Sequence, residues 1–216
     1  PVGGSRHGVL RAADFFAAKT GRPDGRLSTD EWLTVPEFSL AEAVNGEIFR
    51  DDAGDFTRVR KGLAYLPEDV RRKKLAGRLL LMAQAGPYNY PRCVKRGETG
   101  AAQLAVGEFV ASAMHAVFLL NRRYLPYYKW QFRALREMPL LAETAEPLER
   151  FLSTGNGGAL AAEKEGWMAA VADGIQAALV AEGLLAEKTE LERAAYRVND
   201  KVGDSELRNR HILCGV

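Results

Sequence analysis

Two short segments of the chain mix cations with aromatic and amide side chains, the combination that binds nucleotides and nucleic acids. In segment 88–98, a helix beginning at Pro91 would place three cations on one face. In segment 121–133, cations and rings recur at helical spacing. The two segments therefore predict a site for a nucleotide or another small anion. Its candidate residues are Asn89, Tyr90, Arg92, Lys95, Arg96, Glu98, Asn121, Arg122, Tyr124, Lys129, Trp130 and Arg133.

Both segments follow helix ends and carry the same sign of charge, which costs repulsion unless an anion lies nearby. We therefore expect Lys129, Arg92 and Arg96 to converge on one cleft. Glu98 is the candidate acid that orients these arginines and Arg122 through carboxylate contacts. The alternative role for Glu98 is to stabilise the start of the next helix through the helix dipole.

The rings of the two segments have different expected roles. Tyr90 or Tyr124 would stack on a base beside the cations. For Trp130 we favour burial in the helical bundle, because large aromatic side chains are mostly buried. Lys129 is expected to bind the ligand.

Positive charge is concentrated in the middle of the chain. From Arg58 to Arg136 there are sixteen basic and four acidic residues, a net charge of +12. Because the whole chain carries +2, the remainder sums to −10. Such an asymmetry builds a local positive potential that attracts anionic partners. The alternative interpretation is a solvated basic face with ordinary core aromatics.

The sequence contains no self-contained catalytic apparatus. The HExxH, GxSxG, Walker and GxGxxG patterns are absent. His115 stands in an apolar stretch, which predicts a buried, hydrogen-bonded core residue. Asp51-Asp52 indicates turn chemistry rather than a magnesium site. We expect no catalytic residue, no metal ligand and no cofactor in this chain alone.

The composition is ordinary for a soluble globular protein, with 216 residues, 47% hydrophobic and 27% charged. No apolar run approaches the roughly 18 residues that span a bilayer, so we expect no membrane partner. Cys93 and Cys214 form no CxxC pair, and a reducing, cytoplasmic setting is expected. The chain starts at Pro1 rather than at methionine, and we expect it to be the later part of a longer polypeptide or a processed form.

Periodicity, caps and breakers predict helices almost throughout. Ser5 would cap the first helix, Ser28 and Glu31 form a capping box, and Gly86-Pro87 would end a helix. The expected helices cover about 5–19, 28–34, 36–45, 57–65, 67–85, 97–120, 126–137, 140–152, 159–185, 189–200 and 205–212. At most a minor β-hairpin near 47–56 would interrupt them. The predicted fold class is all-α, with an N-terminal helical section at 1–56 and a helical bundle at 57–216.

Three strings carry a resemblance to a known family. They are Tyr65-Leu66-Pro67-Glu68-Asp69-Val70, Tyr88-Asn89-Tyr90-x-Arg92-x-x-x-Arg96-Gly97-Glu98 and Phe118-Leu119-Leu120-Asn121-Arg122-x-Tyr124-x-Pro126-x-x-Lys129-Trp130. Over about residues 15–152 the chain resembles a bacterial domain of unknown function, family 4037. The resemblance implies that an N-terminal nucleotidyltransferase domain precedes this helical domain and is its partner.

Aminoglycoside-modifying nucleotidyltransferases, which that family resembles more distantly, carry their metal-binding acids in an α/β domain. Their helical C-terminal domain supplies basic and aromatic contacts to the nucleotide and the second substrate. The resemblance therefore implies a helical nucleotide- or substrate-binding domain, with a nucleoside triphosphate and magnesium used by the full-length protein. The Gly-Ser motif and paired aspartates of the catalytic half are absent here, so transfer activity is not expected from this chain alone.

Two alternatives stay open. The basic segment could follow the phosphate backbone of RNA, and binding would then weaken steeply with salt, whereas binding of one triphosphate would weaken less. A helical toxin-type RNase is the other, but Arg208-Asn209-Arg210-His211 lacks the spacing that such an enzyme requires.

Overall fold

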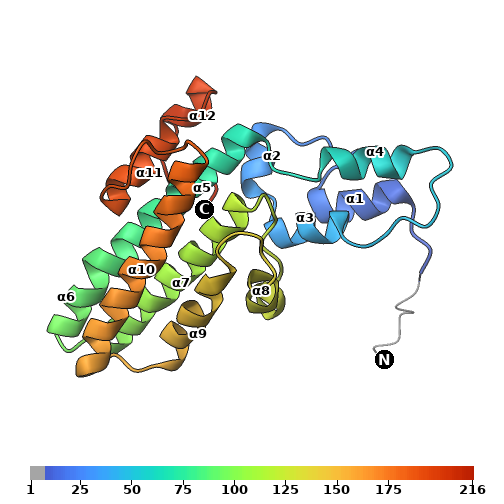
Figure 1. Cartoon of the computed structure of the whole chain (residues 1–216). Coiled ribbons are helices and arrows are strands. Elements are labelled where there is room, and N and C mark those ends of the chain that lie inside the picture. The colour runs from blue at the N-terminus through green and yellow to red at the C-terminus, as the bar shows by residue number, and fades with distance from the viewer. Residues whose placement is uncertain (1–7) are drawn as a thin grey trace.

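The chain forms a helical bundle with a helical arm projecting from one side (Figure 1). This computed structural model describes residues 8–216, so the predicted cap at Ser5 lies outside the described residues. Within 8–216 there is no β-strand, which confirms the all-α fold class. The segment 47–54, where a hairpin was conceivable, is a loop, and the next helix starts at Asp55.

Four short helices build the arm: α1 (Ala12–Thr20), α2 (Thr29–Thr34), α3 (Glu37–Val44) and α4 (Asp55–Gly62). Phe16, Trp32 and Leu40 are buried in its small core. The predicted capping box opens α2, because the Ser28 hydroxyl accepts from the Glu31 N–H and the Glu31 carboxylate accepts from the Ser28 N–H. The predicted division at residue 56 falls inside α4, which lies beside α1 in the arm (Figure 1).

The chain enters the bundle through α5 (Glu68–Ala83), and the prediction that Gly86-Pro87 ends this helix is wrong. A π-helical segment, η1 (Gln84–Asn89), carries the chain directly into α6 (Tyr90–Lys95). The wider π turn accommodates the missing N–H of Pro87 without ending the helical path. Gly86 is required here because a Cβ at this position would lie 2.7 Å from the Phe109 ring.

The central helix α7 (Thr99–Leu120) begins and ends close to the predicted limits. Its length and hydropathy would allow it to span a membrane, contrary to our prediction that no apolar stretch approaches that length. In the structure 67% of the most apolar window is buried inside the bundle, as in a core helix of a folded domain. Val106, Phe109, Ala113 and Val117 are among its fully buried residues.

The rest of the bundle surrounds α5 and α7 (Figure 1). It consists of α8 (Tyr128–Leu135), a 3₁₀ turn η2 (Ala142–Thr144), α9 (Ala145–Ser153), α10 (Ala159–Ala181), α11 (Leu191–Asn199) and α12 (Ser205–Asn209). α9 and α10 pack on α7, and α11 packs along α5. The arm and the bundle therefore meet at one end of α7, and this junction positions the site described next.

Candidate functional site

A buried carboxylate joins the arm to the bundle. Glu37, in the first turn of α3, accepts a hydrogen bond from His115 Nε2 on α7 at 2.8 Å. Lys74 Nζ on α5 lies 3.5 Å from the same carboxylate oxygen. The other oxygen accepts from the Leu125 N–H at 3.2 Å. All three ionisable side chains are buried, so Glu37 is a fully partnered charge inside the protein.

Arg78 lies one turn beyond Lys74 on α5 and has no such partner. Its Nε is buried without a hydrogen-bond acceptor, and its guanidinium forms no salt bridge with any residue from 8 to 216. Buried polar groups in proteins are almost always satisfied, so an orphaned guanidinium N–H points to a missing acceptor.

Lys74, Arg78 and His115 line one open cleft of about 660 Å³, which we call the α5–α7 cleft. Gln131 of α8 and the C-terminal residues 215–216 contribute further to its wall. Its volume falls within the range of ligand pockets in proteins. The cleft therefore combines an unsatisfied cation with room for a small molecule.

The protonation states follow from burial and partners. Burial would raise the pKa of Glu37, but His115, Lys74 and the Leu125 N–H outweigh it and hold that pKa at about 2. Burial lowers the pKa of His115, and burial also lowers the pKa values of Lys74 and Arg78. We therefore assign Glu37 as ionised, with neutral His115 donating its Nε2–H to it. Arg78 stays charged, because a guanidinium keeps its proton in proteins.

Helical spacing explains how these groups meet. Lys74 and Arg78 are at i and i+4 on α5, while Glu108, Ser112 and His115 are at i, i+4 and i+7 on α7. On α7 the set forms a polar stripe on an otherwise apolar helix, and Ser112 donates to Glu108 at 3.0 Å. On α5 the two cations belong to a helix that is charged in its first half. The prediction that His115 is a buried, hydrogen-bonded residue is confirmed. The sequence analysis did not single out Lys74, Arg78, Glu108 or Ser112. The helical spacing within each set is the signal that could have found them.

Aromatic rings form the outer rim of the α5–α7 cleft. Phe38, Tyr127 and Tyr128 all line it. The Phe38 and Tyr127 rings meet edge to face with centroids 5.8 Å apart, and Tyr127 and Tyr128 have centroids 4.6 Å apart. These rings are partly exposed and could stack on a planar group held beside the cations.

The first predicted cluster lies away from this cleft. Arg92 covers the Tyr88 ring, 3.5 Å from its centroid, and the exposed Lys95 and Arg96 lie at the C-terminal end of α6. Asn89 is exposed at the end of η1. Tyr90 was expected to stack on a base, but it is fully buried and donates to Asn156 at 3.3 Å. That expectation is wrong because the Tyr90 ring is part of the bundle core.

Glu98 does not orient the arginines. It stands at the N-cap position of α7 without a side-chain cap bond, and within the described part of the chain its carboxylate forms no salt bridge. Arg122 instead pairs with Glu68 at 2.6 Å and with Glu182 at 3.0 Å. Glu68 belongs to α5 and Glu182 follows α10, so these partners could not be read from sequence spacing.

The second predicted cluster is divided between structural and exposed residues. Asn121 donates to the carbonyls of Val117 and Leu140, and Tyr124 donates to the Leu63 carbonyl at 2.6 Å. Tyr124 is therefore a buried structural residue, which overturns its expected stacking role. The exposed members, Lys129, Trp130 and Arg133, lie on α8. Trp130 is 56% exposed, so its predicted burial is also wrong.

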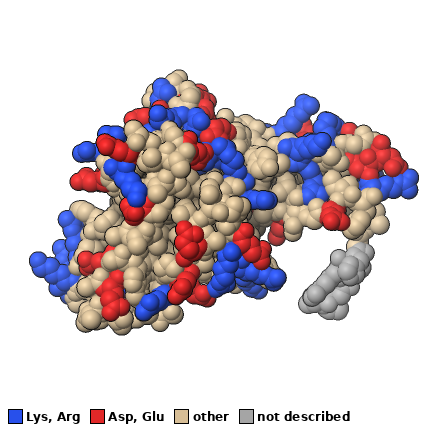
Figure 2. Space-filling model, in the orientation of Figure 1, with Lys and Arg blue, Asp and Glu red and all other residues tan. Residues whose placement is uncertain are grey.

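The predicted convergence of the two clusters is wrong. Arg96 directly precedes α7, whereas Lys129 follows its other end, and 22 helical residues span about 33 Å. α6 and α8 are widely separated in Figure 1. Figure 2 shows basic side chains gathered at the α6 end of the bundle and again around α8, with acidic and uncharged surface between them. The two clusters lie far apart because the long helix α7 stands between them.

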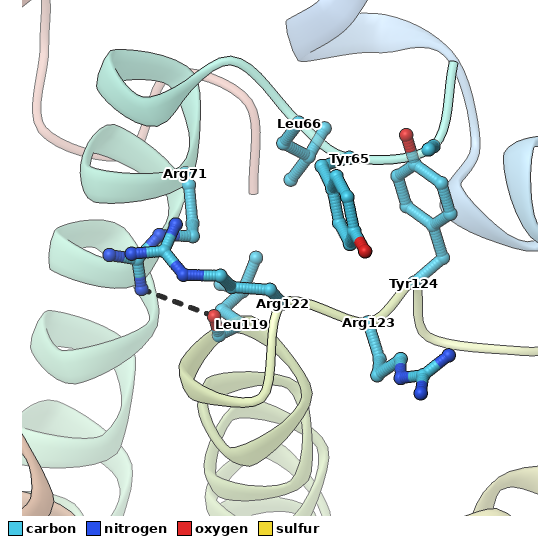
Figure 3. A pocket seen from close by; sticks show the side chains of 8 residues that line it. Tyr65, Leu66, Arg71, Leu119, Arg122, Arg123 and Tyr124 are labelled. Atoms are coloured by element: carbon cyan, nitrogen blue, oxygen red, sulfur yellow. Dashed lines mark hydrogen bonds between the residues drawn. The ribbon is translucent and has the colours of Figure 1, made fainter. Parts of the chain in front are cut away.

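A second hollow adjoins the cleft between α3 and α8. It has a volume of about 1010 Å³, and we call it the outer groove. Tyr65, Arg122, Arg123 and Trp130 are among its lining residues. Figure 3 shows a smaller pocket that shares Tyr65, Arg122, Arg123 and Tyr124 with the outer groove. In it Tyr65 lies between Arg122 and Tyr124, the Arg71 and Arg122 guanidinium groups are near one another, and Arg123 is directed away from them.

Comparison with known families identifies the segment that contains the cleft. Residues 32–131 match a family model. Its description is "Domain of unknown function (DUF4037)", the family that the sequence motifs resemble. The match is shorter than the predicted 15–152, but it contains every cleft residue except Gly215 and Val216. A search of curated proteins and of solved structures gave no match. Among residues 8–216 no group of three potential ligands could hold a metal ion.

Proposed function

We propose that this chain is the helical nucleotide-binding domain of a nucleotidyltransferase-like protein, and that the ligand's phosphates occupy the α5–α7 cleft. The observation that carries the proposal is Arg78, a charged group that lines the cleft and lacks a carboxylate partner. Phosphate oxygens are strong acceptors for such a guanidinium.

The charge of the cleft favours an anion. Lys74 and Arg78 are cations, Glu37 is the one acidic side chain that lines the cleft, and His115 is neutral. Glu37 contacts Lys74, whereas Glu37 and Glu108 act on Arg78 only through space and raise its pKa against the effect of burial. Among residues 8–216 no carboxylate forms a salt bridge with Arg78. In a partly buried site such a charge acts more strongly than on the open surface.

The rim favours a nucleotide over a simple anion. Phe38, Tyr127 and Tyr128 offer ring faces and edges next to the cations, and Gln131 offers an amide for polar contacts. Bases stack on such rings with little dependence on sequence. Among the residues expected from sequence, Lys129 lies beside Tyr128 on α8, whereas Arg92, Lys95 and Arg96 belong to the distant α6 end.

In this proposal the catalytic metal and its acids belong to an N-terminal nucleotidyltransferase domain, and Mg²⁺ enters with the triphosphate. The two free cysteines, Cys93 and Cys214, are compatible with a cytoplasmic protein. The second substrate is an acceptor that this helical domain would help to hold.

Calorimetry with ATP and Mg²⁺ tests the proposal. The unmodified chain should bind, and Arg78→Met should lose about tenfold or more in affinity, because charge-assisted hydrogen bonds contribute roughly 1.5–3 kcal/mol each. Arg96→Ala is the matched control, since Arg96 is exposed and lies at the other end of α7. Absence of binding by the unmodified chain, or equal binding by Arg78→Met, contradicts the proposal.

A further inference from the structure

We infer that the nucleotide bound in the α5–α7 cleft is the terminal residue of a single-stranded RNA, and that the strand continues into the outer groove. This inference rests on the proposed function, because the cleft must first accept a nucleotide. It adds a substrate class and a second binding surface.

The two hollows are adjacent. Phe38, Pro126 and Tyr127 line both the cleft and the outer groove, so one ring-bearing ridge separates them. If one nucleotide places its phosphate at Arg78, the next nucleotide of the strand would cross this ridge into the outer groove. The shared rim therefore places the outer groove within reach of a strand whose end lies in the cleft.

The outer groove has the surface of a stacking platform. Tyr65, Tyr127 and Trp130 line it and are 63%, 44% and 56% exposed. Exposed rings that face one groove are unusual unless something covers them. Sequence-tolerant binding of single strands uses such rings, one for each stacked base.

Unpaired cations accompany these rings. The groove lining also contains two acids, Glu42 and Glu137, and Glu42 pairs with Lys19. The cations are Arg123, which lines the groove, and Lys129 and Arg133, which lie outside the lining beside Trp130 on α8. None of the three forms a salt bridge with a residue that the structure describes. Arg122 differs, because Glu68 and Glu182 hold it. Free cations beside exposed rings match a polyanion with planar bases better than an apolar protein surface.

Fluorescence anisotropy with a labelled ten-residue oligouridylate tests the inference, with uridine triphosphate as the mononucleotide reference. The oligonucleotide should bind more tightly than the mononucleotide. Trp130→Ala should weaken oligonucleotide binding roughly 5- to 150-fold, the effect of removing one stacking ring, and leave mononucleotide binding unchanged. Tyr196→Ala is the control, since Tyr196 is a ring of similar exposure on α11, outside both hollows.

Salt dependence gives a second readout. The plot of log affinity against log salt should be steeper for the oligonucleotide. Arg123→Gln should reduce that slope by roughly 0.7, because one phosphate of the strand is no longer neutralised. Arg78→Met should weaken both ligands, because both place a phosphate in the cleft.

The outcomes separate the two proposals. If mononucleotide binding requires Arg78 but the oligonucleotide binds no better, or Trp130→Ala has no effect, the strand inference fails and the proposed function stands. If neither ligand binds, both fail. Equal affinity for a duplex of the same length also overturns the inference, since paired bases cannot stack on the groove rings.

Discussion

Glu37 accepts a hydrogen bond from His115 at 2.8 Å, although 78 residues separate them in the sequence. The contact ties α3 of the arm to the C-terminal part of α7, and Lys74 and the Leu125 N–H converge on the same carboxylate. Glu37 therefore links the arm to one wall of the candidate site. A buried charge with these partners stabilises the junction only while it stays ionised.

Acid should destabilise the chain through Glu37. Its pKa falls from 4.5 to about 2 in the folded protein, so the stability that it contributes is complete above pH 4.5 and is lost as the pH falls toward 2. The shift corresponds to roughly 3 kcal/mol of stability that depends on pH. In Glu37→Gln the free energy of unfolding should therefore fall by roughly 3 kcal/mol less between pH 6 and pH 2. Urea unfolding from pH 6 to pH 2 measures this dependence.

Some acid sensitivity should persist in Glu37→Gln. Glu68 has its pKa lowered to about 2 as well, because Arg71 and Arg122 outweigh the effect of its burial. If Glu37→Gln loses as much unfolding free energy between pH 6 and pH 2 as the unmodified chain does, Glu37 is not ionised in the folded protein.

Replacing Arg78 should stabilise the protein while removing the anion site. Arg78→Met keeps the aliphatic stem and deletes a guanidinium whose buried Nε has no acceptor. We expect the free energy of unfolding to rise by about 1 kcal/mol, as when an unpaired buried polar group is removed. Thermal or urea unfolding without ligand measures the change. A decrease of more than about 1 kcal/mol would mean that Arg78 has a structural role.

Arg71 should be essential for stability rather than for binding. It is 2% exposed, bonds to Glu68 and Glu182, and donates to the Leu119 carbonyl at 3.2 Å. Arg71→Ala removes the buried guanidinium shared by both carboxylates and the Leu119 carbonyl, and leaves Arg122 as the cation between Glu68 and Glu182. It should cost about 2–3 kcal/mol, the value of hydrogen bonds to charged groups. Arg96→Ala, on the exposed surface, should change the unfolding free energy by less than about 0.5 kcal/mol. Urea unfolding of both variants tests this contrast.

Lys164 should hold the 153–158 loop against the bundle. Its buried ammonium donates to the carbonyls of Phe151 at 3.0 Å and Thr154 at 2.8 Å, and to the Asn156 side chain at 2.8 Å. Lys164→Met removes this donor from the two carbonyls, whereas the Asn156 oxygen keeps its hydrogen bond from Tyr90. The change should cost about 2–3 kcal/mol, with faster amide exchange in the loop.

Lys188→Met is the matched control for Lys164. Lys188 pairs with Asp173 in solvent, so Lys188→Met should lower the free energy of unfolding by less than about 1 kcal/mol. Equal exchange rates for the loop in both variants would contradict the role of Lys164.

Local patterns predicted most helix positions, because caps and breakers act within a few residues. The Ser28–Glu31 capping box and the limits of α7 are examples. The continuation past Gly86-Pro87 was missed, since it depends on the close approach of Phe109 from another helix. The roles of Tyr90, Tyr124 and Trp130 were also missed, because ring burial is set by the neighbours that the fold supplies.

The sequence by itself determined that the chain is helical, that its middle is basic, and that residues 32–131 match a family of unknown function. Only the tertiary structure decided which cations share a site. The length of α7 separates Arg96 from Lys129, whereas the start of α3 lies where Glu37 can contact Lys74 of α5 and His115 of α7. Helical spacing can place residues on one face of one helix, but contacts between helices that are distant in sequence depend on how all the apolar faces pack at once.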